Sequence, residues 1–103
     1  MGDESDDSVP RILEGVRVLD FTQYLAGPTV TRLMAELGAD IVKVEQAPGG
    51  DPSRRLPFFE GGRSAYFVQQ NRGKRSVCLD LTRPDDARPA IRALVSWADV
   101  VLV

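Results

Sequence analysis

Residues 16–28, VRVLDFTQYLAGP, and residues 39–45, ADIVKVE, decide the fold of this chain. Apolar and β-branched residues dominate the start of the first stretch and most of the second, which predicts strands over Val16–Phe21 and Ile41–Glu45. A helix between them completes a βαβ unit with a right-handed crossover. In such a unit the first strand-to-helix loop opens at the carboxyl edge of a parallel sheet, where α/β proteins bind ligands. The sequence therefore predicts an α/β fold with a parallel sheet and flanking helices.

The residues between the two strands carry the signals of a helix. Pro28 suits a first helical turn, and Gly38 can take the left-handed conformation that ends a helix. Apolar residues recur at the spacing of one helical face, the kind of face that packs against a core. This apolar stripe comprises Val30, Leu33, Met34 and Leu37.

The second half of the chain predicts further elements. Residues 46–70 are rich in Gly and Pro and predict a long functional loop whose aromatic clusters need a surface to bury against. Val77–Leu81 predicts a third strand, and Thr82 can cap the helix that follows. Pro89 predicts a kink in that helix or a late start, because proline lacks the backbone donor. The apolar stripe of this second helix comprises Ile91, Leu94, Val95 and Ala98.

The sequence closes on the run Asp99-Val100-Val101-Leu102-Val103. An apolar run of this kind is typical of a central parallel strand covered on both faces. We therefore expect residues 11–103 to be the incomplete amino-terminal part of a larger domain, cut before the loop at that strand's carboxyl end. The acidic residues 1–10 have no periodicity and predict a disordered tail.

Composition excludes several classes of protein. The 103 residues allow one domain at most. No apolar run approaches the roughly 20 residues that cross a bilayer, so we expect no membrane contact. The single cysteine excludes an internal disulfide and fits a reducing cytoplasm. The absence of histidine excludes imidazole catalysis and His-ligated metal sites within this chain, and we predict no metal site.

Positive charge gathers in the middle of the chain. Residues 54–83 contain seven Arg and Lys residues against two acids, whereas residues 1–51 contain four against ten. This asymmetry indicates a middle segment that meets an anion, although solvated loop charges would give the same pattern. A sequence pI near 5.0 argues against a nucleic-acid binder. No Gly-x-Gly-x-x-Gly motif supports a nicotinamide or flavin dinucleotide.

Several polar residues have a structural interpretation. Cys78 lies between apolar residues of a predicted strand, so we expect a buried, inert thiol. Asp20 and Asp40 are expected to cap helices or to accept hydrogen bonds from loop amides, with a role at a binding site as the alternative. Asp51 with Arg54 fits a turn in which the aspartate bonds its own backbone.

Seven motifs occur in the order and spacing of one enzyme family. They resemble the amino-terminal segment of the family III CoA-transferases, the group of formyl-CoA and carnitine-CoA transferases that includes the α-methylacyl-CoA racemases. Each motif is weak alone, but the ordered set extends from Leu13 to Val103. The motifs are Leu13–Phe21, Ala26-Gly27-Pro28, Leu37–Glu45, Gly50-Asp51, Asn71–Ser76, Leu79-Asp80-Leu81 and Ala98-Asp99-Val100.

The resemblance implies a Rossmann-like domain that binds coenzyme A, in a homodimer whose two chains are interlocked. It also implies catalysis by an aspartate that carries the acyl group as a mixed anhydride and then CoA as a thioester. In the family that aspartate lies well beyond the segment matched here. We therefore predict no catalytic residue among these 103.

The same resemblance implies binding residues. Tyr24, Leu25 and Ala26 occupy the first βα loop, which in the family lies beside the thioester end of CoA. The formyl-CoA transferase has Gln where this chain has Leu25, so formate–oxalate specificity is not implied. Gln46 stands where the family often places an Arg that meets CoA phosphate, and it can donate a hydrogen bond without bringing charge.

Two further groups match CoA-binding segments of the family. Residues 79–82 match the segment that borders the adenine: Leu79, Asp80, Leu81 and Thr82. Arg72, Lys74 and Arg75 match the family's basic turn, and within four residues they could converge on phosphate oxygens.

These features predict a CoA-transferase that moves CoA between a CoA-thioester and a carboxylic acid, with CoA as substrate and no permanently bound cofactor. The loop Gln23–Pro28 and the turn Gly49-Gly50-Asp51 look more like the transferases than the racemases. The alternatives are an α-methylacyl-CoA racemase-like isomerase and a non-catalytic CoA-binding fragment. We expect acyl-CoA and carboxylic acids as partners, and neither nucleic acid nor membrane.

Overall fold

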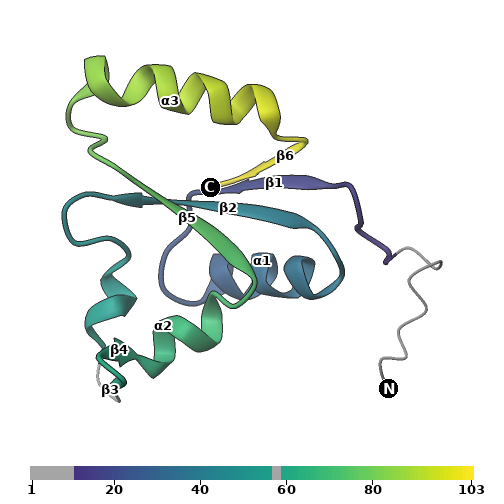
Figure 1. The fold of residues 1–103 in the computed structure, drawn as a ribbon, viewed down its shortest axis with the longest axis vertical. Coiled ribbons are helices and arrows are strands. Elements are labelled where there is room, and N and C mark those ends of the chain that lie inside the picture. Colours follow the sequence, from purple (N-terminus) through teal and green to yellow (C-terminus); the bar gives the residue numbers. More distant parts are fainter. Residues whose placement is uncertain (1–10, 57–58) are drawn as a thin grey trace.

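A computed structural model describes residues 11–56 and 59–103 (Figure 1). The predicted tail over residues 1–10 and the aromatic site at Phe58 lie outside the described residues. Within these described residues, ten elements follow one another. They are β1 (Arg17–Asp20), α1 (Ala26–Glu36), β2 (Asp40–Gln46), the short 3-10 helix η1 (Pro52–Arg55), β3 (Phe59–Glu60), β4 (Arg63–Ser64), α2 (Ala65–Gln70), β5 (Lys74–Leu79), α3 (Pro84–Trp97) and β6 (Val100–Leu102).

Four strands form one parallel sheet in the order β5-β2-β1-β6. Val18 of β1 pairs with Ile41 of β2 on one side and with Val100 of β6 on the other. The chain winds outward from β1 to β2 and β5, and α3 then returns it to the far side of β1. The winding therefore reverses between β1 and β6, which is where open α/β sheets bind ligands at the carboxyl ends of their strands.

Helices cover both faces of this sheet, which confirms the predicted α/β architecture. Figure 1 shows α1 and α2 on one side of the sheet and α3 on the other. Val18 and Ile41 face α1, where Met34 packs against them. Leu19 and Val42 face α3 and form the second core layer. Successive side chains of each strand point to opposite faces of the sheet and so form two cores, as expected of a sheet buried on both faces.

The face of α1 that meets the sheet differs from the prediction. Val30, Leu33 and Leu37 are 44–48% exposed, so most of the predicted apolar stripe points away from the core. The helix instead buries Pro28 and Thr31. Thr31 is accommodated because its hydroxyl finds a buried acceptor from β1.

Other boundaries also differ from those predicted. The segment 46–70 contains η1, a short antiparallel hairpin of β3 and β4, and the helix α2, so it is not a structureless loop. β5 begins at Lys74, three residues before the predicted strand. α3 begins at Pro84 and includes Pro89, so of the two predicted effects of Pro89 the late start was wrong, and the kink stays a prediction. No helix within residues 11–56 and 59–103 has the length and apolar character needed to cross a bilayer.

Candidate functional site

An open cleft of about 520 Å³ lies at the carboxyl edge of the sheet, where the winding reverses. The end of β6 forms one wall, and the loop after β1 with the start of α1 forms the other. α1 has no acidic residue in its first turn, so the positive end of its dipole is not offset there. The cleft is lined by Phe21, Thr22, Gln23, Ala26, Gly27, Val30, Leu102 and Val103.

Close packing between Thr22 and Gly27 shapes this cleft. A Cβ atom added at Gly27 would lie 2.2 Å from the Thr22 Cβ, so glycine alone fits here. The loop after β1 therefore folds tightly onto the first turn of α1. This contact gives Gly27 a packing role in addition to its place in the Ala-Gly-Pro turn.

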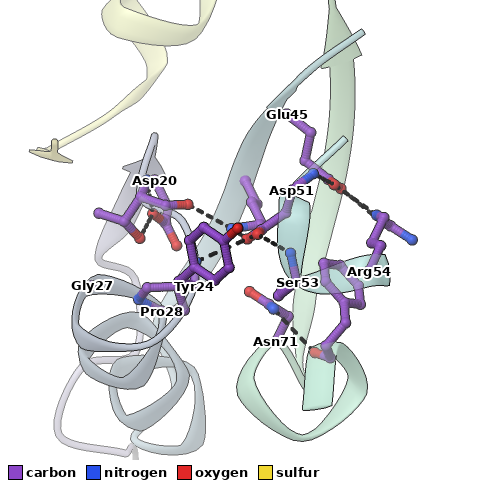
Figure 2. A network of polar contacts seen from close by, with 12 residues as sticks. Asp20, Tyr24, Gly27, Pro28, Glu45, Asp51, Ser53, Arg54 and Asn71 are labelled. Carbon is purple, nitrogen blue, oxygen red and sulfur yellow. Dashed lines mark hydrogen bonds and ion pairs between the residues drawn. The ribbon is translucent and has the colours of Figure 1, made fainter. Parts of the chain in front are cut away.

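A network of mostly buried charges lies beneath the loop, on the face of the sheet that α1 covers (Figure 2). Three carboxylates and three cations pair within it. The Nζ–O distance is 2.9 Å for Lys43–Asp51 and 3.2 Å for Lys74–Asp20, and the side chains of both pairs are at most 1% exposed. The third pair is Arg54–Glu45, at 2.7 Å. Because the charges balance, no carboxylate of the network is left without a counter-charge.

Asp20 stands at the carboxyl end of β1 and is fully buried. Its Oδ1 accepts hydrogen bonds from the Thr22 amide and hydroxyl, and its Oδ2 accepts from Thr31 Oγ1 at 2.6 Å. Burial alone would raise the pKa of Asp20, but the hydrogen bonds from Thr22 and Thr31 outweigh it and hold the pKa below its ordinary value. The expectation that Asp20 bonds loop amides is confirmed.

Glu45 anchors the other side of the network. Its Oε1 accepts from the Asp51 amide at 2.7 Å, and its two oxygens bind the Arg54 guanidinium at 2.7 Å each. Burial would raise the pKa of Glu45, but the bonds from Arg54, the Asp51 amide and Ser76 lower it to about 2. The Arg54 guanidinium also lies 3.8 Å from the centre of the Phe67 ring. Asp51 accepts from the Ser53 amide at 2.9 Å, which confirms the predicted aspartate turn.

Two groups of predicted site residues meet at the carboxyl edge. Tyr24 and Leu25 are about half exposed in the loop beside the cleft, and Ala26 lines the cleft itself. Gln46 closes β2, where its Nε2 donates to Asp80 Oδ1 at 3.2 Å and its Oε1 accepts from the Leu81 amide at 3.1 Å. The side chain of Gln46 thus links β2 to the segment Leu79–Thr82. The sequence predicted CoA contacts for both Gln46 and this segment.

The basic turn is placed differently. Arg72 lies before the amino end of β5 and pairs with Glu36, and Arg75 pairs with Asp40 through both carboxylate oxygens at 2.8 Å. The Lys74 ammonium is buried against Asp20, Asn71 and the Pro28 carbonyl. The three cations therefore pair with three different acids, and their convergence on phosphate oxygens of CoA stays a prediction. Because Arg72 and Arg75 lie near the amino end of β5 and neither lines the carboxyl-edge cleft, we expect these two residues to contribute little to CoA binding.

Sequence reasoning missed Lys43 and Thr31, and it misjudged Cys78. Lys43 is 1% exposed in the second-from-edge strand β2, and Thr31 is 0% exposed in α1. A lysine between Val42 and Val44 in a parallel strand was the signal, because a charged residue in such a place needs a buried partner. Cys78 is exposed, beside Glu45 in a small open pocket, so its predicted burial was wrong.

Comparison with known proteins shows which family this chain resembles. The model of CoA-transferase family III matches residues 13–103. A probable fatty acyl-CoA transferase of Mycobacterium tuberculosis is 46% identical over 93 residues, which are 87% of this chain and 23% of the relative. A succinyl-CoA:mesaconate CoA-transferase of Haloarcula hispanica is 52% identical over 95 residues, 87% of this chain and 24% of the relative. A formyl-CoA:oxalate CoA-transferase of Rhodopseudomonas palustris is 42% identical over 93 residues, 89% of this chain and 22% of the relative.

Solved structures show the same likeness. A crystal structure of Rv3272 from Mycobacterium tuberculosis superposes with a TM-score of 0.79 at 44% identity, covering 90% of this chain and 26% of that one. A CAIB/BAIF family protein from Brucella suis gives a TM-score of 0.79 at 41% identity, covering 90% and 25%. The chain thus spans about a quarter of the length of the relatives it matches. With the family model matched across residues 13–103, the chain belongs to CoA-transferase family III.

Proposed function

We propose that the protein carrying this chain moves CoA between a CoA-thioester and a carboxylic acid, and that this chain supplies part of its CoA-binding edge. The observation that carries the proposal is the cleft at the carboxyl edge between β1 and β6, walled by the Ala-Gly-Pro turn of the family. Such a switch point is the usual ligand site of an open α/β sheet. Relatives named as CoA-transferases support the reaction class.

We assign roles along this edge. Tyr24, Leu25 and Ala26 would lie beside the thioester, with Ala26 in the cleft wall. Attack of a carboxylate on a thioester carbonyl places negative charge on the carbonyl oxygen, and the amino end of α1 would favour that charge. Gln46 would position Leu79–Thr82 against the adenine, because its amide already bridges Asp80 and Leu81.

The nucleophilic aspartate of the proposed reaction belongs to another part of the protein. Asp20 is the carboxylate nearest in sequence to the cleft-lining loop, but it is fully buried and each of its oxygens accepts hydrogen bonds. Its lowered pKa also weakens it as a nucleophile, since basicity and nucleophilicity of a carboxylate fall together. The role of nucleophile is therefore not assigned to Asp20.

Isotope exchange tests the proposal directly. The full-length protein is incubated with an acyl-CoA panel and labelled free acids, and label appearing in the thioester demonstrates transfer. Loss of the α-hydrogen of a 2-methylacyl-CoA in heavy water, without exchange of acids, would instead establish the racemase-like alternative. CoA binding without either reaction would leave the non-catalytic alternative. We expect residues 1–103 alone to transfer no label from acid to thioester, because we predict that the nucleophilic aspartate is not among them.

We also propose that the full-length protein acts in the cytoplasm as a homodimer of interlocked chains. The single cysteine fits a reducing compartment, and family membership supports the assembly. Sedimentation of the full-length protein should give twice the mass of one chain at all practical concentrations. A concentration-dependent monomer would contradict interlocking, because linked chains cannot separate without unfolding.

A further inference from the structure

A buried ion pair is joined to the loop that lines the cleft. Lys43 Nζ lies 2.9 Å from Asp51 Oδ2, and the two side chains are 1% and 0% exposed. The same Nζ donates to the Thr22 carbonyl at 2.7 Å. Lys43 belongs to β2, so this bond ties the loop after β1 to the neighbouring strand.

Asp51 reaches the same loop with its other oxygen. Oδ1 accepts from the Tyr24 amide at 3.4 Å and from the Ser53 amide at 2.9 Å. Figure 2 shows Asp51 between the Tyr24 loop and the turn at Ser53. One carboxylate therefore contacts the loop, β2 (through Lys43) and the first turn of η1.

The loop needs this support because of Tyr24. Its φ is +67°, and it is the one non-glycine residue with positive φ in the described part of the chain. An L-residue with a side chain rarely adopts this conformation, and it persists where the surrounding contacts over-determine it. The bonds to the Thr22 carbonyl and the Tyr24 amide lie on either side of Gln23, and they fix the peptide groups that lead into the unusual conformation.

We propose that Lys43 and Asp51 are positioning residues that hold the loop Thr22–Ala26 in the shape that receives the CoA-thioester. This inference rests on the proposed function. Neither side chain lines the cleft, whereas Thr22, Gln23 and Ala26 do. A buried ion pair is a poor source of stability compared with apolar residues of the same size, so its retention in the centre of a sheet is better explained by what it orients.

The first test removes the pair without leaving an unpaired charge. The full-length double variant K43M/D51N keeps the approximate size of both side chains. We expect it to fold, to bind CoA at least about tenfold more weakly and to lose kcat/KM by a similar factor. Amide hydrogen exchange should accelerate at Tyr24 while it stays unchanged at Leu19 in the buried strand β1.

A matched control separates positioning from stability. E45Q/R54M removes the neighbouring ion pair on the same face, and Gln retains an acceptor for the Asp51 amide. Among the described residues, neither the Glu45 nor the Arg54 side chain forms a hydrogen bond to residues 22–26. We expect this control to lower the denaturation midpoint but to leave CoA affinity and exchange at Tyr24 unchanged.

Substitution of Tyr24 tests the role of its conformation. Glycine takes positive φ without strain, so Tyr24→Gly should reduce the need for the pair. We expect K43M/D51N to weaken CoA binding at least threefold less in the Tyr24→Gly background than in the native one. This double-mutant cycle cancels the direct effect of removing the tyrosine ring.

Each outcome bears on one of the two proposals. If the native protein neither binds CoA nor transfers it between acids, the proposed function fails. Faster amide hydrogen exchange at Tyr24 in the double variant would still support the orienting contacts. If the native protein is active and a folded K43M/D51N has native CoA affinity, kcat/KM and Tyr24 exchange, the positioning role is overturned and the function stands. Should the double variant not fold, K43M/D51L takes its place, because it removes both charges together with the acceptor for the Tyr24 amide. An unchanged CoA affinity in that folded variant overturns the inference equally.

Discussion

The Nζ of Lys74 lies 3.2 Å from Oδ2 of Asp20, and both side chains are at most 1% exposed. The sequence separation is 54 residues, so this contact joins the basic turn to the end of β1. Lys74 also donates to Asn71 Oδ1 at 2.8 Å. A residue of the predicted phosphate-binding turn is thereby part of the buried network beneath the first βα loop.

Because Lys74 is buried, its substitution should destabilise the protein more than substitution of Arg72 or Arg75. Lys74→Ala leaves the Asp20 carboxylate buried without its cation, so we expect the free energy of unfolding to fall by about 3–5 kcal/mol. Arg72→Ala and Arg75→Ala remove guanidinium groups that are 60% and 66% exposed, and should each cost less than about 1 kcal/mol. Urea denaturation of the three variants measures the difference. Equal losses would contradict the burial of Lys74.

CoA binding by Arg72 and Arg75 is a separate question. Both side chains lie near the amino end of β5 and are paired with Glu36 and Asp40, away from the carboxyl-edge cleft. We expect Arg72→Ala and Arg75→Ala to change the CoA dissociation constant by less than about threefold, because solvated pairs of this kind contribute little. Calorimetric titration with CoA and dephospho-CoA checks this. A tenfold or greater loss that shrinks for dephospho-CoA would establish the phosphate contact that the sequence pattern suggested.

The hydrogen bonds of Glu45 predict a specific acid dependence. The pKa of Glu45 falls from 4.5 to about 2 on folding, so the unfolded state binds the proton more tightly. The resulting stabilisation is complete above about pH 4.5 and is lost as the pH falls toward 2. A shift of this size corresponds to roughly 3 kcal/mol. Glu45→Gln should flatten the dependence of the unfolding free energy on pH in this window, which urea denaturation at a series of pH values measures.

The orientation of α1 can be tested with two neighbouring residues. Thr31→Val keeps the shape but removes the donor to Asp20 Oδ2, and leaving that buried oxygen short of a partner should cost about 1–3 kcal/mol. Val30→Thr changes a side chain that is 48% exposed and should stay within about 0.5 kcal/mol. Thermal unfolding compares the two. A larger loss for Val30→Thr would mean that the predicted apolar stripe faces the core after all.

Much of the architecture follows from the sequence. The apolar and β-branched content of the two stretches Val16–Phe21 and Ile41–Glu45 predicts two parallel strands, because strands of a parallel sheet are buried on both faces. Pro28 and Gly38 place the helix between them, within two residues of its observed ends. The ordered motifs also carried the resemblance to the family, which the family model confirms over residues 13–103.

The tertiary structure alone decided which polar groups pair inside the protein. The periodicity of α1 favours Val30 and Leu33 on the buried face, but Asp20 at the end of β1 needs a donor, and Thr31 supplies it. Lys74 is likewise drawn inward by the same carboxylate rather than outward to a ligand. Thr31 and Lys74 are 11 and 54 residues from Asp20 in sequence, so no local sequence pattern predicts these contacts. A buried charge must find its counter-charge wherever the fold brings one within reach, and that requirement overrides local propensity.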